Sequence, residues 1–222
     1  MKRICRYLPI LSLPLLCVPF ASAQSSVDFR LGFGTARDKS NGGGIDSPDS
    51  VNAYGICTPG TGDPYCLTNP DLGGFFLGFG GDVMLWRRFG IGATADVQPK
   101  RSNYGPLLYR QAFYDVNAIF APVSTKRVSL HLEGGIGGAH TGFAINQSGC
   151  VGTAVCSNQT LPVGTSNHFD IHAGVGISLY VTEHVFIRPE FDLHYAPGLT
   201  DQFNSNVVPA GMVWVGYSFG ER

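Results

Sequence analysis

The stretch HVFIRPEFDLHYAP, residues 184–197, carries a charged or titratable side chain on every second position of its middle part. These side chains are Arg188, Glu190, Asp192 and His194. The stretch HFDIHAGVGISLYV, residues 168–181, repeats the spacing with Asp170 and His172. A histidine beside a carboxylate can act as a general base with an orienting partner, and such pairs can also bind a metal ion. Alternation with period two predicts strands with one polar and one apolar face, so the chemistry depends on which face meets water.

The first 23 residues have the composition of a secretory signal peptide. Three basic residues precede an apolar run, and Ala21-Ser22-Ala23 offers a small-residue cleavage site. A membrane anchor is the alternative, but three prolines interrupt the run, which is short for a span of about 20 residues. We therefore expect residues 1–23 to be removed on export and residues 24–222 to form one barrel domain.

The charge of the exported part excludes some classes of partner. Without residues 1–23 the chain keeps 12 basic against 16 acidic residues, a net charge of −4. No basic patch points to nucleic acid. No later segment has the roughly 18 consecutive apolar residues of a transmembrane helix, whereas a membrane-spanning β-barrel remains open.

Period-two alternation recurs along the chain and predicts an all-β fold with eight antiparallel strands. The expected strands are 27–35, 71–86, 89–98, 109–122, 128–140, 168–181, 184–197 and 206–219. Their connections alternate between tight turns and longer segments rich in Gly, Pro, Asn, Asp and Ser, the latter being 36–70, 99–108, 141–166 and 197–205. In an up-and-down barrel all tight turns and both termini then lie at one end, as in outer-membrane barrels.

Two orientations of the alternating faces compete, that of a soluble barrel and that of a membrane barrel. A soluble barrel needs many charges on its outer face, but residues 24–222 contain only three lysines, all in expected turns or loops. Glycines recur on the polar face, as expected where opposite walls crowd a narrow interior. Aromatic residues gather near both ends of the apolar faces as candidate interface girdles: Phe29, Phe89, Phe120 and Phe219, and Phe75, Tyr114, Phe169 and Tyr195. We therefore expect the apolar faces to meet lipid and the charges to face inward.

The last strand carries the most specific pattern. Val213, Val215, Tyr217 and Phe219 alternate toward an aromatic end. In this pattern, and in its strand count over residues 24–222, the chain resembles the small OmpA-like and OmpX-like outer-membrane barrels. The resemblance implies a bacterial outer-membrane location, with membrane lipid and the barrel assembly machinery as partners.

The inward-facing charges are interpreted as a salt-bridge network that fills the barrel. The candidate residues are Arg30, Asp82, Asp115, Glu133, Asp170, His172, Arg188, Glu190, Asp192 and His194. Both arginines should approach carboxylates, with Asp115, Glu133 and Glu190 as the expected partners, because an unpaired buried cation costs several kcal/mol. An enzyme would use His172 or His194 with Asp170 or Glu133, but no neighbouring nucleophilic serine is evident. A metal cluster of His131, His168, His172 and His194 is a further alternative, although the alternation already explains these residues.

Residues 24–222 contain four cysteines: Cys57, Cys66, Cys150 and Cys156. An even number in an exported chain favours disulfides, and the spacings match no zinc pattern. Three connectivities exist. We expect Cys57–Cys66 and Cys150–Cys156, because the first and third outer loops emerge from opposite arcs of the rim and a bridge needs Cα atoms within about 7 Å.

The sequence thus predicts a non-enzymatic outer-membrane barrel without metal or cofactor, which stabilises the envelope or makes surface contacts through its outer loops. An extracellular surface ligand is an expected partner, though its identity stays open. A narrow solute or ion pore and a lipid-modifying enzyme are the alternatives. Bulky inward residues argue against a wide channel, namely Phe76, Met84, Phe113, Met212 and Trp214.

Overall fold

The computed structural model describes residues 26–38, 44–45, 56–57, 67–68, 71–86, 88–104, 107–151 and 155–220. The expected signal peptide, residues 1–23, and Cys66 lie outside these ranges. Within them, no helix is long and apolar enough to cross a membrane.

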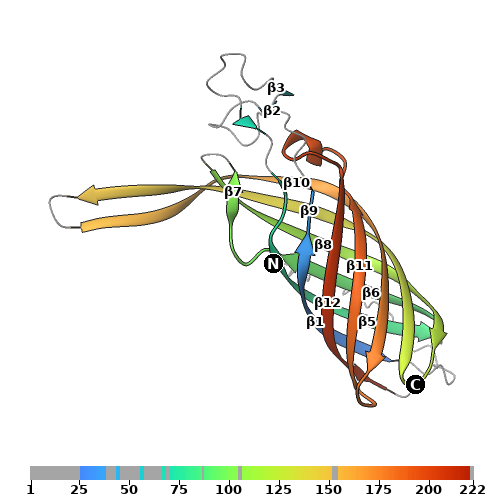
Figure 1. Ribbon diagram of the computed structural model, residues 1–222. Coiled ribbons are helices and arrows are strands. Elements are labelled where there is room, and N and C mark those ends of the chain that lie inside the picture. The colour runs from blue at the N-terminus through green and yellow to red at the C-terminus, as the bar shows by residue number, and fades with distance from the viewer. Residues whose placement is uncertain are drawn as a thin grey trace, which may run out of the picture.

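Eight long strands form one closed antiparallel barrel (Figure 1). They are β1 (Val27–Ala36), β5 (Phe75–Trp86), β6 (Phe89–Val97), β8 (Leu107–Ser124), β9 (Val128–Val151), β10 (Val155–Tyr180), β11 (Val185–Tyr195) and β12 (Val207–Phe219). Each strand pairs with its neighbour in the chain, and β1 pairs with β12 from Val27↔Phe219 to Ala36↔Ala210 to close the ring. Within the ring, closure satisfies the backbone hydrogen bonds of the strands and leaves no open edge. The predicted all-β, eight-stranded up-and-down barrel is confirmed.

The two ends of the barrel differ as the sequence predicted. Short turns connect β5 to β6, β8 to β9 and β10 to β11, at the end where Val27 pairs with Phe219. The other end carries the longer connections. These include the short strands β2 (Gly44–Ile45), β3 (Ile56–Cys57), β4 (Leu67–Thr68) and β7 (Ser102–Tyr104), and the 3₁₀ helix η1 (Leu199–Asp201).

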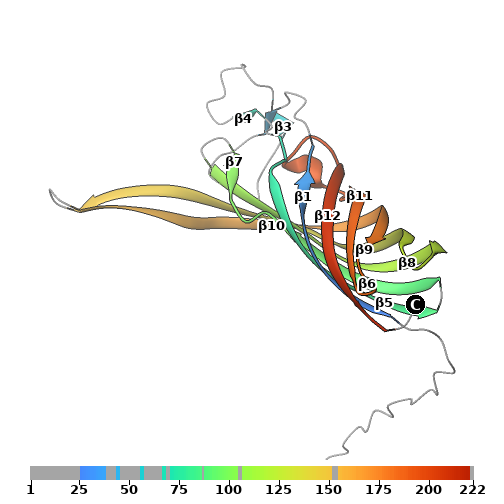
Figure 2. The same cartoon turned by 60° about the horizontal axis from the view of Figure 1, so that its bottom comes forward.

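The third long connection differs from the prediction. Residues 141–166 were expected to form a loop, yet most of them continue β9 and β10 as a two-stranded hairpin. The pairing runs to Val151↔Val155, with one irregularity between Pro162 and Gly164. Figures 1 and 2 both show the hairpin projecting well beyond the barrel wall. Local composition favoured a loop, but pairing between the two segments satisfies their backbone groups and overrides that preference.

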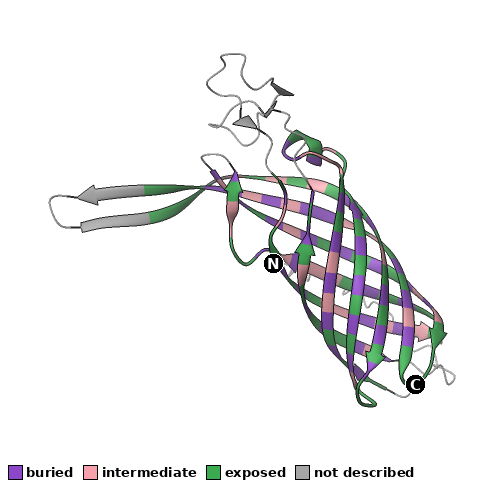
Figure 3. Ribbon diagram, in the orientation of Figure 1, coloured by how far each residue is buried: buried purple, intermediate pink, exposed green. Residues whose placement is uncertain are grey.

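Burial alternates along most of each strand within the barrel (Figure 3). In β11, for example, the even-numbered residues from Phe186 to His194 are buried, while the odd-numbered residues between them are exposed. Phe29 and Leu31 are about two-thirds exposed, whereas Arg30 between them is 2% exposed. The charged faces therefore point into the barrel and the apolar faces point outward.

An aromatic layer closes the interior at the long-loop end. Tyr104, Tyr109, Phe143 and Phe203 meet there in edge-to-face contacts, with ring centroids 5.1–6.1 Å apart. The hydroxyl of Tyr104 donates to the carbonyl of Gln202 at 2.5 Å, and this bond holds the η1 segment over the barrel mouth. Each of these rings is almost completely buried, so side chains and not solvent occupy this end.

Asp38 connects two of the loops beside the aromatic layer. Its Oδ2 accepts the backbone N–H of Ser205 at 2.7 Å. Burial raises the pKa of this carboxyl group above its ordinary value, although the Ser205 hydrogen bond acts in the opposite direction. The first and fourth long connections are thus fixed to each other at the rim.

Candidate functional site

The structure buries every charged residue that the sequence analysis placed inside the barrel. We call this set the interior charge network: Arg30, Asp82, Asp115, Glu133, Asp170, His172, Arg188, Glu190, Asp192 and His194. It divides into an arginine layer toward the tight-turn end and a histidine layer toward the aromatic layer. The strands supply these side chains from inward positions, so the spacing along each strand sets the depth of every charge.

The arginine layer is centred on Asp82 of β5. Its Oδ2 lies 2.6 Å from Nη1 of Arg30 and 3.0 Å from Nη1 of Arg188. Glu133 approaches Arg30 at 3.6 Å. Two guanidinium groups from β1 and β11 therefore share one fully buried carboxylate.

Further contacts fix Arg188 on all sides. Its Nε donates to the hydroxyl of Ser178 at 2.8 Å, while Asp28 and Glu190 each lie 3.7 Å from its terminal nitrogens. The guanidinium also lies over the ring of Phe186, 5.1 Å from its centroid. Glu133 and Glu190 were expected partners of the arginines, but the expectation for Asp115 was wrong. Asp115 lies higher in the barrel and faces His194, because its position on β8 places it beside the histidine layer.

Trp214 joins the arginine layer to the bulky contents of the interior. Its indole N–H donates to Oε1 of Glu190 at 2.7 Å, and the guanidinium of Arg30 lies 4.8 Å from its ring. The ring fits because Gly32 and Gly78 face it. A Cβ on Gly32 would lie 2.4 Å from Cε3 of Trp214, closer than two carbon atoms can approach. The sequence predicted that Trp214 fills space in the interior, but not that it contacts both Glu190 and Arg30.

The histidine layer contains two acid–histidine pairs. Nδ1 of His194 lies 2.6 Å from Oδ2 of Asp170 and 4.0 Å from Oδ2 of Asp115. Nε2 of His172 lies 3.5 Å from Oδ1 of Asp192. The two imidazole rings stack with centroids 5.3 Å apart, and Phe113 covers the ring of His194 at 4.3 Å. The considered four-histidine cluster does not assemble, since His168 instead contacts the hydroxyl of Ser166 at 2.8 Å.

The histidine pairs have the geometry of a general base and its orienting carboxylate, but both imidazole rings are buried. His172 is 5% exposed and His194 is 2% exposed. Among the residues that the structure describes, no serine hydroxyl hydrogen-bonds to either ring. This arrangement can compensate charge and hold protons or cations, whereas a substrate has no space beside the rings.

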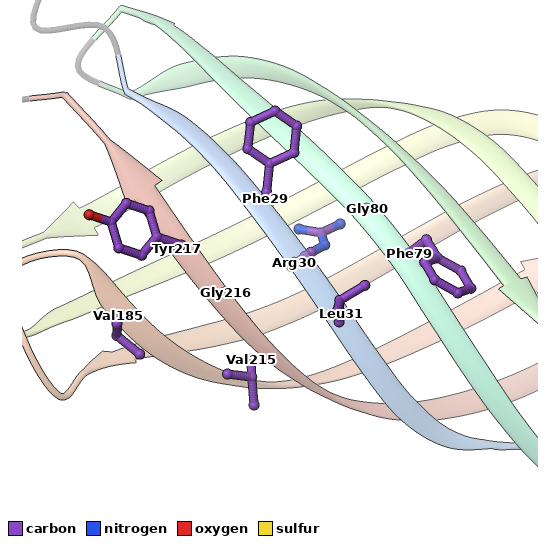
Figure 4. Close-up of a pocket in the computed structure, with 9 residues that line it drawn as sticks. All are labelled: Phe29, Arg30, Leu31, Phe79, Gly80, Val185, Val215, Gly216 and Tyr217. Atoms are coloured by element: carbon purple, nitrogen blue, oxygen red, sulfur yellow. The ribbon is translucent and has the colours of Figure 1, made fainter.

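The outer wall presents an apolar surface in place of a polar one. Beside β1 it has a shallow groove whose sides are Phe29, Leu31, Phe79, Val185, Val215 and Tyr217. Arg30, Gly80 and Gly216 complete its lining (Figure 4). The expected girdle residues are mostly exposed, and Phe29 and Phe219 contact each other edge to face at 6.0 Å.

The residues predicted on the last strand share one face, and two of the cysteines face each other in the hairpin. Val215, Tyr217 and Phe219 point outward and Val213 is half-buried, so the four share the outer face of β12. The backbone register of the hairpin places Cys150 directly opposite Cys156. Cys57 belongs to β3, while its expected partner Cys66 is outside the described residues.

No protein-family model matches the sequence, and no curated protein sequence matches it. Solved structures do match. Ail, the attachment invasion locus protein of Yersinia pestis, in complex with the heparin analogue sucrose octasulfate, superimposes with a TM-score of 0.50 at 12% identity, covering 88% of this chain and 99% of Ail. OprG from Pseudomonas aeruginosa matches with a TM-score of 0.46 at 13% identity, over 90% of this chain and 99% of OprG. Neisserial surface protein A matches with a TM-score of 0.45 at 11% identity, over 90% of this chain and 98% of Neisserial surface protein A.

The fold is that of the small outer-membrane β-barrels. The match to Ail supports this assignment, and because the sequence identity is only 12% it shows a shared fold and nothing further. The strand number, closure and short turns of the chain agree with it.

Proposed function

We propose that this chain is a non-enzymatic integral protein of the bacterial outer membrane that stabilises the envelope and makes surface contacts through its outer loops. The observation that supports the proposal best is the inside-out distribution of polarity. Leu31, Phe79, Ile91, Val116 and Ile136 are each more than half exposed on the outer wall, while the charges lie inside. Contiguous exposed apolar surface of this kind is unfavourable in water and favourable in lipid.

The interior supports a closed barrel more than a pore. Trp214, Phe76, Phe113 and both arginines are almost completely buried within it. The aromatic layer then covers the long-loop end. Eight strands enclose a space that side chains can fill, so we expect no continuous wide channel.

The β9–β10 hairpin supports a role in surface contact. In the proposed orientation the tight turns lie on the periplasmic side, as in outer-membrane barrels, and the hairpin at the other end extends outside the cell. Ail binds the polyanion sucrose octasulfate. Residues 139–169 of this chain contain no lysine or arginine, so a sulfated polyanion is not the ligand we propose for the hairpin. Its exposed Ile145 and Leu161 favour a neutral, partly apolar partner.

The proposal is tested by fractionating cells that express the chain and by electrophoresis with and without boiling. We expect the protein in the outer membrane, migrating faster unboiled because the closed barrel persists in detergent. Added protease should cut the hairpin on intact cells while the barrel strands stay protected. A soluble periplasmic protein with one gel mobility would contradict the proposal.

Two assays separate the proposal from its alternatives. Stable single-channel currents from purified protein in planar bilayers would favour a pore. A mass change of lipid A on expression would favour a lipid-modifying enzyme. We expect neither, because the aromatic layer closes the mouth and the histidines are covered.

A further inference from the structure

We propose that Asp115, Asp170 and His194 form an interior binding site for one divalent transition-metal cation such as zinc. One ligand atom from each residue, two carboxylate oxygens and one imidazole nitrogen, lies within 4.8 Å of the others. Zinc takes histidine nitrogen and carboxylate oxygen ligands, and three protein ligands with one water complete a tetrahedral site. The proposal goes beyond the envelope role and depends on the barrel interior alone.

The unsatisfied atoms around His194 provide the second argument. Oδ1 of Asp115 and Oδ1 of Asp170 are buried and accept no hydrogen bond from any residue in the described ranges. Asp115 is 5% exposed and Asp170 is fully buried. Buried carboxylate oxygens without partners are costly. The oxygens next to His194 are the Oδ2 atoms, so a cation would satisfy Oδ1 by binding each carboxylate through both oxygens or through Oδ1.

Asp96 adds a further carboxylate to the same region. It lies opposite Phe113 in the β6–β8 ladder, and Phe113 is stacked on His194. Its Oδ1 is also buried and accepts no hydrogen bond from the described part of the chain. Asp96 is not within 4.8 Å of all three ligand atoms, so it adds negative charge near the site and is not counted as a ligand.

The charge balance separates this triad from the rest of the interior. Arg30 and Arg188 are within 4 Å of Asp28, Asp82, Glu133 and Glu190, so their charge compensates the arginine layer. No arginine or lysine ion pair reaches Asp115 or Asp170 among the described residues. With a neutral imidazole the triad carries two negative charges, which one divalent cation would neutralise.

A second triad lies next to the first and serves as an internal comparison. Glu133, His172 and Asp192 also place ligand atoms within 4.8 Å of one another. Glu133, however, is already 3.6 Å from Arg30, and a guanidinium beside a ligand opposes cation binding. The triad around His194 is therefore the favoured site.

The geometry needs only a small adjustment to bind zinc. Two ligands about 2.1 Å from a tetrahedral ion lie about 3.4 Å apart. The observed 2.6 Å between His194 and Asp170 must widen, while the 4.0 Å between His194 and Asp115 must shorten. Because Phe113 and the aromatic layer cover the site, the ion should be bound most readily during folding.

The experiment is to refold the full chain into detergent micelles with zinc, remove free metal by buffer exchange, and measure zinc per folded barrel by mass spectrometry. We expect about one ion per chain, and zinc should raise the urea midpoint of unfolding as a ligand of the native state does. The matched variants are Asp115→Asn and Asp170→Asn, which preserve side-chain shape. Each should weaken zinc binding at least about tenfold, as even loss of an outer-shell partner does.

Two controls exclude other sites. Glu133→Gln, in the second triad, should weaken zinc binding less than either asparagine variant does. The double variant His140→Ala/His168→Ala, which removes histidines near the hairpin, should retain the ion. Folding of each variant is verified by its heat-modifiable migration.

Three results would overturn the proposal. The first is a wild-type barrel that folds in the presence of zinc but retains none. The second is equal zinc retention by the wild type and both asparagine variants. Loss of zinc only in the surface-histidine variant would assign the binding to the exterior. None of these results would bear on the envelope role, which fractionation tests separately.

Discussion

Arg30 and Asp82, 52 residues apart in the chain, form the shortest arginine–carboxylate contact in the interior at 2.6 Å, and both side chains are fully buried. Because Arg188 contacts the same carboxylate oxygen at 3.0 Å, three strands are joined through one atom. Charges at this depth require compensation, since leaving one unpaired costs several kcal/mol. Asp82 is therefore the residue on which the arginine layer depends.

Asp82→Asn removes that charge without changing the volume of the side chain. The two arginines would then lack their shared partner, and we expect the free energy of unfolding to fall by about 3–5 kcal/mol. Urea unfolding in micelles measures the change. Asp71→Asn is the matched control, because Asp71 pairs with Arg37 at 4.0 Å while both are more than half exposed, which is worth about 0–1 kcal/mol. Equal effects of both variants would contradict the network.

Gly32→Ala tests the fit of Trp214. The new methyl group would overlap the indole ring and displace it from Glu190, at a cost of about 1–3 kcal/mol. Gly211→Ala is the control, because nothing lies within 4 Å of a Cβ at that position. Combining Gly32→Ala with Trp214→Leu should cost less than the sum of the single changes. Strict additivity in urea unfolding would show that the two sites do not interact.

Alternation within single segments was sufficient to predict the eight strands and the face of each charge. The alternation within β11 alone placed Arg188, Glu190 and Asp192 on the same face, without knowledge of the neighbouring strands. Their contacts were harder to predict, because Arg30, Asp82 and Arg188 come from three strands whose relative shift is set by the whole barrel. Asp115 was assigned to the wrong partner for this reason. The aromatic layer was missed because Tyr104 and Phe203 lie in connections without periodicity.

Val116→Arg places a charge on the outer wall. Val116 is 65% exposed in the middle of the barrel part of β8, so in lipid the arginine should cost about 2–4 kcal/mol. Refolding into lipid vesicles followed by urea unfolding measures this cost. Gln147→Arg, at an exposed site on the hairpin, should change stability by less than about 0.5 kcal/mol. Similar small effects at both sites would indicate that water surrounds the wall.

Cys150 and Cys156 are expected to form a disulfide near the tip of the hairpin. Their positions face each other in the register, and directly opposite residues of antiparallel strands are about 4.5–5.5 Å apart at Cα, within disulfide range. Peptide mapping without reductant should recover this link, together with Cys57–Cys66. Reduction should increase proteolysis of the hairpin and leave the unfolding midpoint of the barrel unchanged. A peptide joining Cys57 or Cys66 to Cys150 or Cys156 would contradict both pairings.

The central claim, that the apolar wall meets lipid while the charged face is enclosed, is tested most directly by the chain's two tryptophans. Trp86 is 63% exposed at the tight-turn end of β5, where it pairs with the outward-facing Phe89, whereas Trp214 is fully buried inside. In vesicles of brominated lipid, the Trp214→Phe variant, which retains Trp86, should show strong fluorescence quenching. The Trp86→Phe variant, which retains Trp214, should show much weaker quenching in the same vesicles. Stronger quenching of Trp214 than of Trp86, or quenching of neither, would contradict the claim.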